Sequence, residues 1–344
     1  MDVIDSATLA QYLNTPLSIG EKTIPNRMVL APMAGLGHIA FRELVDQFGG
    51  FGLLFTGMCS ARAVPQENPK ISPVFSWRPE ELKHTACQIF GATPEEMAKA
   101  AKRIEAEGFF GVDLNFGCSV AAICKRGAGA ALLKTPDTAV RVVEAVRNAV
   151  SCPVMVKYRT GWSNDAEFPV ALGKRFQEAG ADALTFHPRV APDRRSRPPR
   201  WDIIGELVQA VDIPVFGNGN LFEVADGIKM IQTTGCQGLS LGRMAVARPW
   251  IFAQWTKGLA PEENIYEDTA QTLLTLLGNH YDPRYAVKLF KKLLPYFCAN
   301  FKFSHAILKE MMKADTLEEM RNNVTRLLNP VPATMARPNL NLFV

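Results

Sequence analysis

The sequence predicts an α/β protein: a (β/α)₈ TIM barrel followed by a small all-helical C-terminal domain. Short β-rich apolar runs alternate with longer amphipathic segments, polar residues follow these runs, and no strand pattern occurs near the C-terminus. Near-continuous apolar strands with helical crossovers are typical of a parallel sheet covered by helices, and eight repeats suggest a closed barrel. The eight runs are residues 28–31, 53–56, 85–90, 112–116, 153–158, 183–187, 214–217 and 238–241.

The segments between the runs carry helix and turn signals. Residues 17–24 alternate around a Gly-Glu turn and predict a hairpin that closes the barrel floor. Thr-Pro pairs followed by acidic residues predict helix starts for the runs 93–107 and 135–150. Glycine stops at 180–182 and 235–237 lead directly into the next strand. A doubly wound sheet is the main alternative, but no GxGxxG follows the first strand.

Beyond the barrel, residues 267–328 show only helical periodicity. Within them, 284–292 place cations beside aromatic residues, a pattern more typical of an amphipathic helix with lysines facing solvent than of an RNA-binding element. We expect domains at 1–255 (barrel), 256–330 (helical, RNA-binding) and 331–344 (irregular tail).

Composition and charge limit the classes of function. The chain has 344 residues, of which 47% are apolar and 21% charged, typical of a globular protein. Its net charge of +4 is too small to demonstrate nucleic-acid binding. Seven scattered cysteines without a CxxC pair argue against disulfides and zinc. With no signal-peptide or transmembrane pattern, we expect a cytoplasmic protein.

Candidate site residues cluster where the predicted strands end, the face on which barrel enzymes carry their active sites. A single Lys or His at a strand end is usually structural, but their joint placement on one rim favours a functional site. In strand order, these residues are Pro32, Met33, Ala34, Gln88, Asn115, Cys118, Lys157, His187, Asn218, Gly219, Asn220, Gly242 and Arg243.

The last two strands point to a phosphate. Residues 217–220 and 241–243 offer glycine amides beside one guanidinium, and barrels commonly bind phosphate after strands seven and eight. Ordinary turn glycines are the alternative. No carboxylate pair, metal cluster or Ser-His-Asp order stands out, so hydrolysis and metal catalysis are less favoured. Gln, Asn, Lys and His around a phosphate suit a flavin. An unperturbed thiol, with a pKa of about 8.5, keeps its proton at neutral pH and is able to act as an acid.

Nearly the whole chain resembles the tRNA-dihydrouridine synthases, flavin enzymes with an FMN-binding barrel and a helical C-terminal domain. Each motif is weak alone, but their order along the chain is distinctive. They are residues 29–35 with Phe41-Arg42, 88–91, 113–118 with 127–133, 156–162, His187, 217–219 and Gly242-Arg243.

The resemblance implies a role for each site residue. FMN is recharged by NADPH, hydride passes to uridine C6, and Cys118 protonates C5. Asn115 holds the flipped-out uridine, whose removal from its stack favours loop positions in tRNA. The implied FMN contacts are Pro32, Met33 and Ala34 through their backbone, Gln88, Lys157 and His187 for ring and ribityl chain, and Asn218, Gly219, Asn220, Gly242 and Arg243 for the phosphate. We expect a monomer that binds tRNA, but neither DNA nor a membrane.

The sequence departs from the family pattern twice. Ser119 replaces the usual proline after Cys118, and Ala121-Ala122 replace a basic pair, which removes possible phosphate contacts. After His187, the usual Gly-Arg-Thr gives way to a Pro-rich loop with five arginines, including Arg194 and Arg195. This loop is either an RNA-binding element or a solvated loop.

Three classes of function remain. The first is the RNA-modifying reductase. The second is an FMN barrel oxidoreductase acting on a small molecule, of dihydroorotate or ene-reductase type. The third is an RNA-binding protein that has lost catalysis, suggested by Ser119 and the alanine pair. The helical C-terminus and the arginine-rich loop favour the first.

Overall fold

A computed structural model describes residues 5–191, 193 and 197–343 of the chain. These residues form two compact units, each assembled from two stretches of the chain. The first comprises Met1–Pro32 and Gly52–Leu241, and the second Met33–Phe51 and Gly242–Val344. The domain boundary expected at residue 255 is a different division and stays a prediction.

The first unit is a parallel barrel, as predicted. Among the described residues, eight strands follow one another in the order β3-β11-β10-β9-β8-β7-β6-β4, and a parallel bridge between Val29 and Leu53 joins its two ends. A short additional strand, β5 (Cys59–Ser60), also pairs with β6. The barrel strands are β3 (Met28–Leu30), β4 (Leu54–Phe55), β6 (Thr85–Phe90), β7 (Gly111–Phe116), β8 (Val154–Gly161), β9 (Ala183–Val190), β10 (Val215–Asn218) and β11 (Gly238–Leu241).

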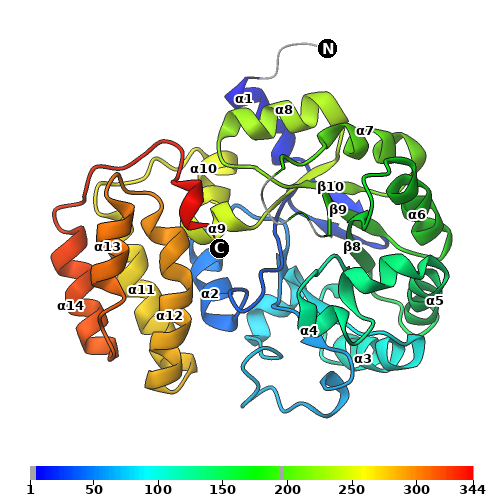
Figure 1. The fold of residues 1–344 in the computed structure, drawn as a ribbon, viewed down its shortest axis with the longest axis horizontal. Helices are drawn as coiled ribbons and strands as arrows, with labels where there is room; N and C mark the ends of the chain where they lie inside the picture. Colours follow the sequence, from blue (N-terminus) through cyan, green and yellow to red (C-terminus); the bar gives the residue numbers. More distant parts are fainter. Residues whose placement is uncertain (1–4, 192, 194–196, 344) are drawn as a thin grey trace. The chain divides into compact units, whose positions relative to one another are not determined.

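Helices of the first unit surround these strands (Figure 1). Their apolar residues recur every three or four positions, so each helix buries one face. In α5, for example, Ala139, Val142, Val143 and Val146 are buried. The helices are α1 (Ser6–Leu13), α3 (Pro94–Ala106), α4 (Ala121–Cys124), α5 (Pro136–Arg147), α6 (Glu167–Glu178), α7 (Trp201–Ala210) and α8 (Val224–Thr234), with 3₁₀ turns at Val64–Gln66, Pro79–His84 and Gly129–Lys134. The helix starts predicted near 93 and 135 are confirmed.

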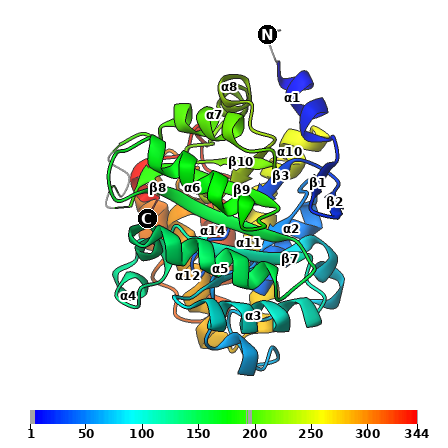
Figure 2. The same cartoon turned by 90° about the vertical axis from the view of Figure 1, so that its right-hand side faces the viewer.

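The predicted hairpin consists of β1 (Leu17–Ile19) and β2 (Lys22–Ile24), visible at the edge of Figure 2. Its side chains Leu17, Ile19 and Ile24 are buried in one cluster with Val29 and Met155, among other strand residues of the barrel. Because these strand residues lie near the amino ends of their strands, the hairpin closes the barrel opposite the face that carries the candidate site.

The second unit is helical, as the periodicity of 267–328 predicts. In Figure 1, α11 to α14 lie side by side. The long helix α12 buries Ala286, Val287 and Phe290, so the apolar side chains of 284–292 face inward. This unit contains α2 (Ile39–Phe48), α9 (Arg243–Ala247), α10 (Ile251–Lys257), α11 (Ile265–His280), α12 (Pro283–Cys298), α13 (Ser304–Met311), α14 (Leu317–Leu328) and a 3₁₀ turn at Leu340–Leu342. Within the described residues, no helix is long and apolar enough to cross a membrane.

Candidate active site

The loop that carries Cys118 follows β7 and is held by the side chain of Asn115. Asn115 Oδ1 accepts hydrogen bonds from the backbone N–H groups of Gly117 (3.1 Å) and Cys118 (2.9 Å). On the other side, the carbonyl of Cys118 accepts a hydrogen bond from the backbone of Ala130 at 2.9 Å. Both backbone groups of Cys118 are therefore fixed, while its thiol is only half-buried.

Gly129 explains part of the motif 127–133. Its φ is +61°, and an added Cβ would lie 2.6 Å from the carbonyl oxygen of Cys118. A glycine is required here both by the left-handed backbone and by the close approach of the Cys118 loop. The indole of Trp162 donates to the carbonyl of Ala130 at 2.7 Å, and Lys134 lies 4.0 Å from the centre of the same ring. These contacts fasten the segment against which Cys118 rests.

Below this loop, polar side chains replace apolar ones in the barrel interior. Asn115 Nδ2 donates to Gln88 Oε1 at 2.8 Å, and Gln88 Nε2 donates to Asp113 Oδ2 at 2.5 Å. Gln88 and Asp113 are fully buried, and Asn115 is nearly so. Burial raises the pKa of Asp113 to about 7, although the Gln88 hydrogen bond and the charge of Lys157 oppose the rise.

Lys157 lies on β8 beside these hydrogen-bonded side chains, and it is the register partner of Asn115. Desolvation lowers the pKa of Lys157 to about 8, and the charge of Arg159 adds to the effect, while Asp113 and Cys118 counter it. Its ammonium donates no hydrogen bond to any residue that the structure describes. A half-buried cation with unused donors suits an anionic or carbonyl-rich ligand.

The strand-end residues of β9 and β10 form a second part of the site. Asn218 Nδ2 donates to the carbonyl of Ser240 at 2.7 Å, which ties β10 to β11. Gly219 and Asn220 have φ angles of +117° and +56°, and an added Cβ on Gly219 would lie 3.0 Å from the ring of His187. Consecutive residues with positive φ turn backbone N–H groups to one side, a geometry found in anion-binding loops.

Two side chains outside the predicted cofactor site support this turn. Trp201 Nε1 donates to the carbonyl of Gly219 at 3.1 Å, and Arg189 Nη2 donates to Asn220 Oδ1 at 3.2 Å. Arg189 is buried and belongs to β9. This arginine of the Arg-rich segment therefore has a structural contact within the barrel.

Of the other four arginines of that segment, the structure describes two. Arg194 and Arg195 lie outside the described residues. Arg197 is largely exposed and lies 3.7 Å from Asp193, and Arg200 pairs with Asp202 at 2.7 Å. Exposed ion pairs of this kind contribute little to stability, so the loss of either pair would hardly change the stability of the fold.

The remaining predicted site residues lie at the junctions of the two units along the chain. Pro32 ends the first stretch of the first unit, whereas Met33, Ala34, Gly242 and Arg243 belong to the second. The Met33 carbonyl accepts from the backbone of Leu36 and Gly37 at 3.0 Å each. Arg243 begins α9, and its guanidinium lies 5.7 Å from the centre of the Phe343 ring. Their roles in cofactor binding stay predictions.

The alanine pair at which the sequence departs from the family pattern begins a short helix, and two basic residues follow that helix. Residues 121–124 make up α4, in which Ala121 and Ala122 are exposed and Val120 before them is 53% exposed. Lys125 and Arg126 follow directly and are exposed. The basic pair is thus absent at 121–122, but two cations lie one turn further along the same loop.

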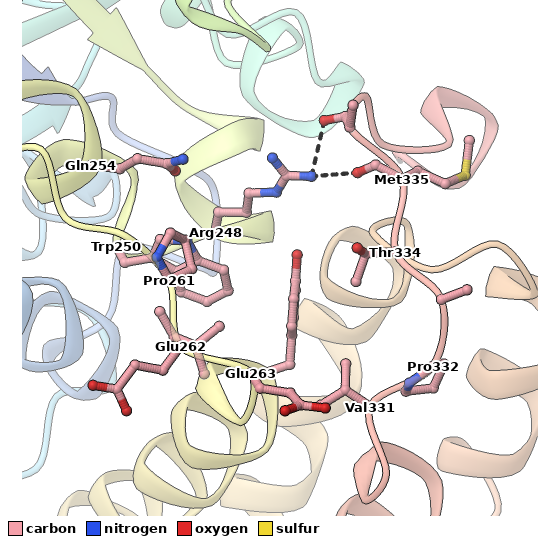
Figure 3. A pocket seen from close by; sticks show the side chains of 14 residues that line it. Arg248, Trp250, Gln254, Pro261, Glu262, Glu263, Val331, Pro332, Thr334 and Met335 are labelled. Carbon is pink, nitrogen blue, oxygen red and sulfur yellow. Dashed lines mark hydrogen bonds between the residues drawn. The ribbon is translucent and has the colours of Figure 1, made fainter.

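A cavity of about 620 Å³ lies within the second unit and contains none of the predicted site residues (Figure 3). Arg248 lines it and donates through Nη2 to the carbonyls of Met335 (2.7 Å) and Ala336 (3.0 Å). Arg248 Nε also donates to Asn300 Oδ1 at 2.7 Å. The cavity wall therefore anchors residues 331–336, the start of the segment expected to be an irregular tail.

Asp113 is the main site residue that the sequence analysis named only as part of a motif and did not assign a role. In the otherwise apolar run 112–116, Asp113 and Asn115 stand two positions apart and so point to the same face of the strand. Two polar residues on one face of a doubly buried strand are a signal for an interior polar site. The register confirms it, because Gln88 on β6 pairs with Asp113.

Comparison with known proteins agrees with this geometry. Residues 29–335 match the family model described as "Dihydrouridine synthase (Dus)". The chain is 31% identical to a probable tRNA-dihydrouridine synthase 1 of Synechocystis over 319 residues, which cover 88% of this chain and 87% of the relative. It is 32% identical to tRNA-dihydrouridine synthase B of Pseudomonas aeruginosa over 82% of this chain and 86% of that one.

Solved structures with low sequence identity share the fold alone. A 2-naphthoyl-CoA reductase complex is similar with a TM-score of 0.58 at 13% identity, covering 96% of this chain and 71% of that one. Histamine dehydrogenase from Rhizobium sp. 4-9 is similar with a TM-score of 0.56 at 14% identity, over 78% and 51% of the two chains. The family match and the relatives, taken with the Cys118 loop, establish that the chain belongs to the dihydrouridine synthase family.

Proposed function

We propose that this protein reduces uridines of tRNA to 5,6-dihydrouridine, with FMN as its cofactor, NADPH as the reductant of FMN, and Cys118 as the proton donor. The observation that carries the proposal is the held loop after β7. It leaves one half-buried thiol at the carboxyl end of the barrel, with both backbone groups of Cys118 hydrogen-bonded. Family membership supplies the reaction class.

The donor set of the first unit fits FMN. Lys157 has an ammonium with unused donors, which suits the carbonyl edge of the flavin ring, where a cation stabilises negative charge. The positive φ angles of Gly219 and Asn220 suit the phosphate. In this proposal Gln88, Lys157 and His187 contact ring and ribityl chain, and Pro32, Met33, Ala34, Asn218, Gly242 and Arg243 complete the site. When bound and reduced, FMN supplies the hydride for C6 of the uridine.

The chain's own residues supply the proton and the positioning. Cys118 Sγ gives its proton to C5 of the uridine, and the resulting thiolate lies near the positive charges of Lys157 and Arg159. Asn115 Nδ2 donates to Gln88 Oε1 at 2.8 Å and to Met58 Sδ at 3.0 Å, and in this proposal a uracil carbonyl takes the place of the weak sulfur acceptor. Arg194, Arg195, Lys125 and Arg126 are the proposed contacts for RNA phosphates.

The proposal is tested by mass spectrometry of dihydrouridine, mapped by position, in RNA from cells with and without this gene. Loss of dihydrouridine at defined tRNA positions, restored by the wild-type gene but not by Cys118→Ala, is the expected result. Unchanged dihydrouridine in all RNA would contradict it. The flavoprotein would then be assayed against enones and dihydroorotate, because a small-molecule reductase is the alternative on the same barrel.

A further inference from the structure

Three buried side chains in the barrel interior form one directed chain of hydrogen bonds that ends at the backbone of Gly117 and Cys118. Asp113 Oδ2 accepts from Gln88 Nε2 (2.5 Å), and Gln88 Oε1 accepts from Asn115 Nδ2 (2.8 Å). Asn115 Oδ1 accepts from the N–H groups of Gly117 and Cys118. Every donor in this chain points away from the loop and toward Asp113, so the chain has a single polarity.

The polarity of the chain is set at its buried end. A carboxamide has nearly the same shape after its oxygen and nitrogen are exchanged, so Gln88 and Asn115 are each able to face either way. Above its pKa of about 7, the Asp113 carboxylate is ionised and only accepts hydrogen bonds, and it is fully buried with Gln88 as the hydrogen-bond donor to its Oδ2. Gln88 must then present its nitrogen to Asp113 and its oxygen to Asn115. Asn115 must in turn present its nitrogen to Gln88 and its oxygen to the loop.

The alternative orientation of Asn115 is costly for the loop. If its amide were reversed, Nδ2 would face the N–H groups of Gly117 and Cys118, which are 3.1 and 2.9 Å from the atom now there. Two backbone donors would lose their acceptor and face another donor. Leaving such groups without a partner is unfavourable when they are shielded from water.

We propose that Asp113 is a positioning residue that, through Gln88 and Asn115, fixes the backbone of Cys118 and so holds the thiol in place for proton donation. Its role in catalysis rests on the proposed function above, whereas its role in orienting the loop does not. Asp113 touches neither substrate nor cofactor in this proposal. It acts on the reaction only by fixing the orientation of the side-chain amides of Gln88 and Asn115.

Hydrogen exchange of the Gly117 and Cys118 amides in flavin-free protein tests the proposal directly. Asp113→Leu removes the acceptor at the buried end, and Gln88→Met breaks the second link. Each should accelerate exchange at these two amides by about tenfold or more, the effect of losing a hydrogen bond of about 1.4 kcal/mol. Exchange along β8 (Val154–Gly161) should not change, because a local effect is expected.

Thr160→Val is the matched control. Thr160 is a buried polar residue on β8, 2% exposed, whose hydroxyl has no partner among the described residues and which does not belong to the chain. This variant should leave exchange at Gly117 and Cys118 at the wild-type rate. Wild-type protection of both amides in folded Asp113→Leu would overturn the proposal. Should that variant fail to fold, the same result in Gln88→Met would overturn it.

A kinetic measurement separates this proposal from the proposed function. In the FMN-loaded enzyme, Asp113→Leu should lower kcat for uridine reduction by a larger factor than the rate at which NADPH reduces the flavin, with the KM for tRNA unchanged. Accelerated amide exchange in an enzyme that never reduces uridine would leave the orienting role of Asp113 intact and contradict only the proposed reaction. Equal losses in both half-reactions would contradict a specific effect on Cys118.

Discussion

Cys118 differs from the other cysteines of the chain in its surroundings. Five of the seven, including Cys236 and Cys298, are buried, and burial raises the pKa of both of these thiols. Cys124 is half-buried, but its Sγ lies 3.5 Å from the Cys118 carbonyl, to which it donates. Cys118 therefore combines a partly accessible thiol with a fixed backbone, which is what a proton donor requires.

Replacing the thiol tests the proton donor separately from cofactor binding. Cys118→Ala should lower the rate of uridine reduction by about a hundredfold to ten-thousandfold, the usual contribution of a general acid. Single-turnover oxidation of the reduced enzyme by tRNA measures this rate. The amount of bound FMN, measured by its visible absorption, should be unchanged. Cys124→Ala serves as the control. A Cys118→Ala enzyme with the wild-type rate would exclude the thiol as the acid.

Asp113 and Lys157 should make stability depend on pH in opposite senses. The pKa of Asp113 is raised from 3.8 to about 7 by burial, so between these values the folded state binds more protons than the unfolded state. Its contribution therefore becomes less favourable as pH rises from about 4 to 7. The pKa of Lys157 is lowered from 10.5 to about 8, so its contribution becomes more favourable as pH rises above about 8.

Asp113→Asn removes the first of these effects. Thermal unfolding of flavin-free protein at pH 5 and pH 7.5 should show wild type losing about 2 °C or more relative to Asp113→Asn as pH rises, since a pKa shift of one unit corresponds to about 1.4 kcal/mol. Asp137→Asn is the control, because Asp137 is 82% exposed on α5 and undergoes the same change in charge. An equal pH response of the two variants would contradict the assignment.

The segment between β7 and α5 shows how one loop is held by the next. The 3₁₀ turn Gly129–Lys134 supplies the amide of Ala130 to the Cys118 carbonyl, and Trp162, the residue after β8, donates to the carbonyl of Ala130. Ser119 takes the place of the usual proline, but the contacts on both sides of Cys118 come from Asn115 and Ala130. The position of Cys118 thus depends on its neighbours rather than on the residue that follows it.

Two glycines of this segment allow a matched comparison. Gly129→Ala should destabilise the protein by about 1–3 kcal/mol more than Gly127→Ala, because its Cβ would lie 2.6 Å from the Cys118 carbonyl. Gly127 has a similar φ of +72°, but its Cβ would meet only Ala92 at 3.6 Å. Denaturant unfolding of both variants measures the difference. Equal stability would show that the close approach at Gly129 carries no cost.

The sequence predicted the barrel well where strands are apolar and less well where they are not. All eight predicted runs are strands, but β8 extends to Gly161 and β9 to Val190, beyond the predicted ends at 158 and 187. The pairing continues with Arg159 opposite His187 and, after a register shift, Gly161 opposite Val190. The polar residues of this stretch hid it from a search for apolar runs. Likewise, the partnership of Gln88 with Asp113 depends on the register of β6 and β7, which residue types alone do not reveal.

The position of α2 was also outside what periodicity can show. Its sequence places it between the first two barrel strands, as a barrel helix would be, yet it packs against α11 in the second unit. His280 on α11 lies 2.6 Å from Glu43 on α2, and the Thr256 hydroxyl donates to the Gly50 carbonyl at 3.1 Å. Which helix packs on which is a property of tertiary contacts, so it could not be inferred from the chain alone.

The packing of the segment after α2 is open to the same kind of test. Gly50 has a φ of +82°, and an added Cβ would lie 2.5 Å from the backbone nitrogen of Ala253. Gly50→Ala should lower the melting temperature clearly more than Gly258→Ala, whose φ is +68° but whose Cβ would meet nothing within 4 Å. Differential scanning calorimetry measures both. A similar small decrease in the two would argue against close packing at Gly50.

For the molecule as a whole, the proposed binding of tRNA depends on local charge because the net charge is only +4. Arg194→Ala/Arg195→Ala should weaken tRNA binding and reduce the salt dependence of log K by about two, one for each lost phosphate contact. Filter binding between low and physiological salt measures this slope. Lys99→Ala/Lys102→Ala, two exposed lysines of α3, is the control with the same loss of charge. An unchanged slope in the arginine variant would show that Arg194 and Arg195 do not contact RNA phosphates.

The path of the chain between the two units has a consequence for its synthesis. The chain leaves the first unit after Pro32, returns at Gly52 and leaves again after Leu241. On the ribosome, α2 therefore emerges long before α11, the helix that covers it, has been made. Until the C-terminal helices are complete, the apolar side chains of α2 have no native cover, so a nascent or prematurely terminated chain would expose them to chaperones and proteases. Chaperones and proteases would thus act on α2 until α11 has been synthesised.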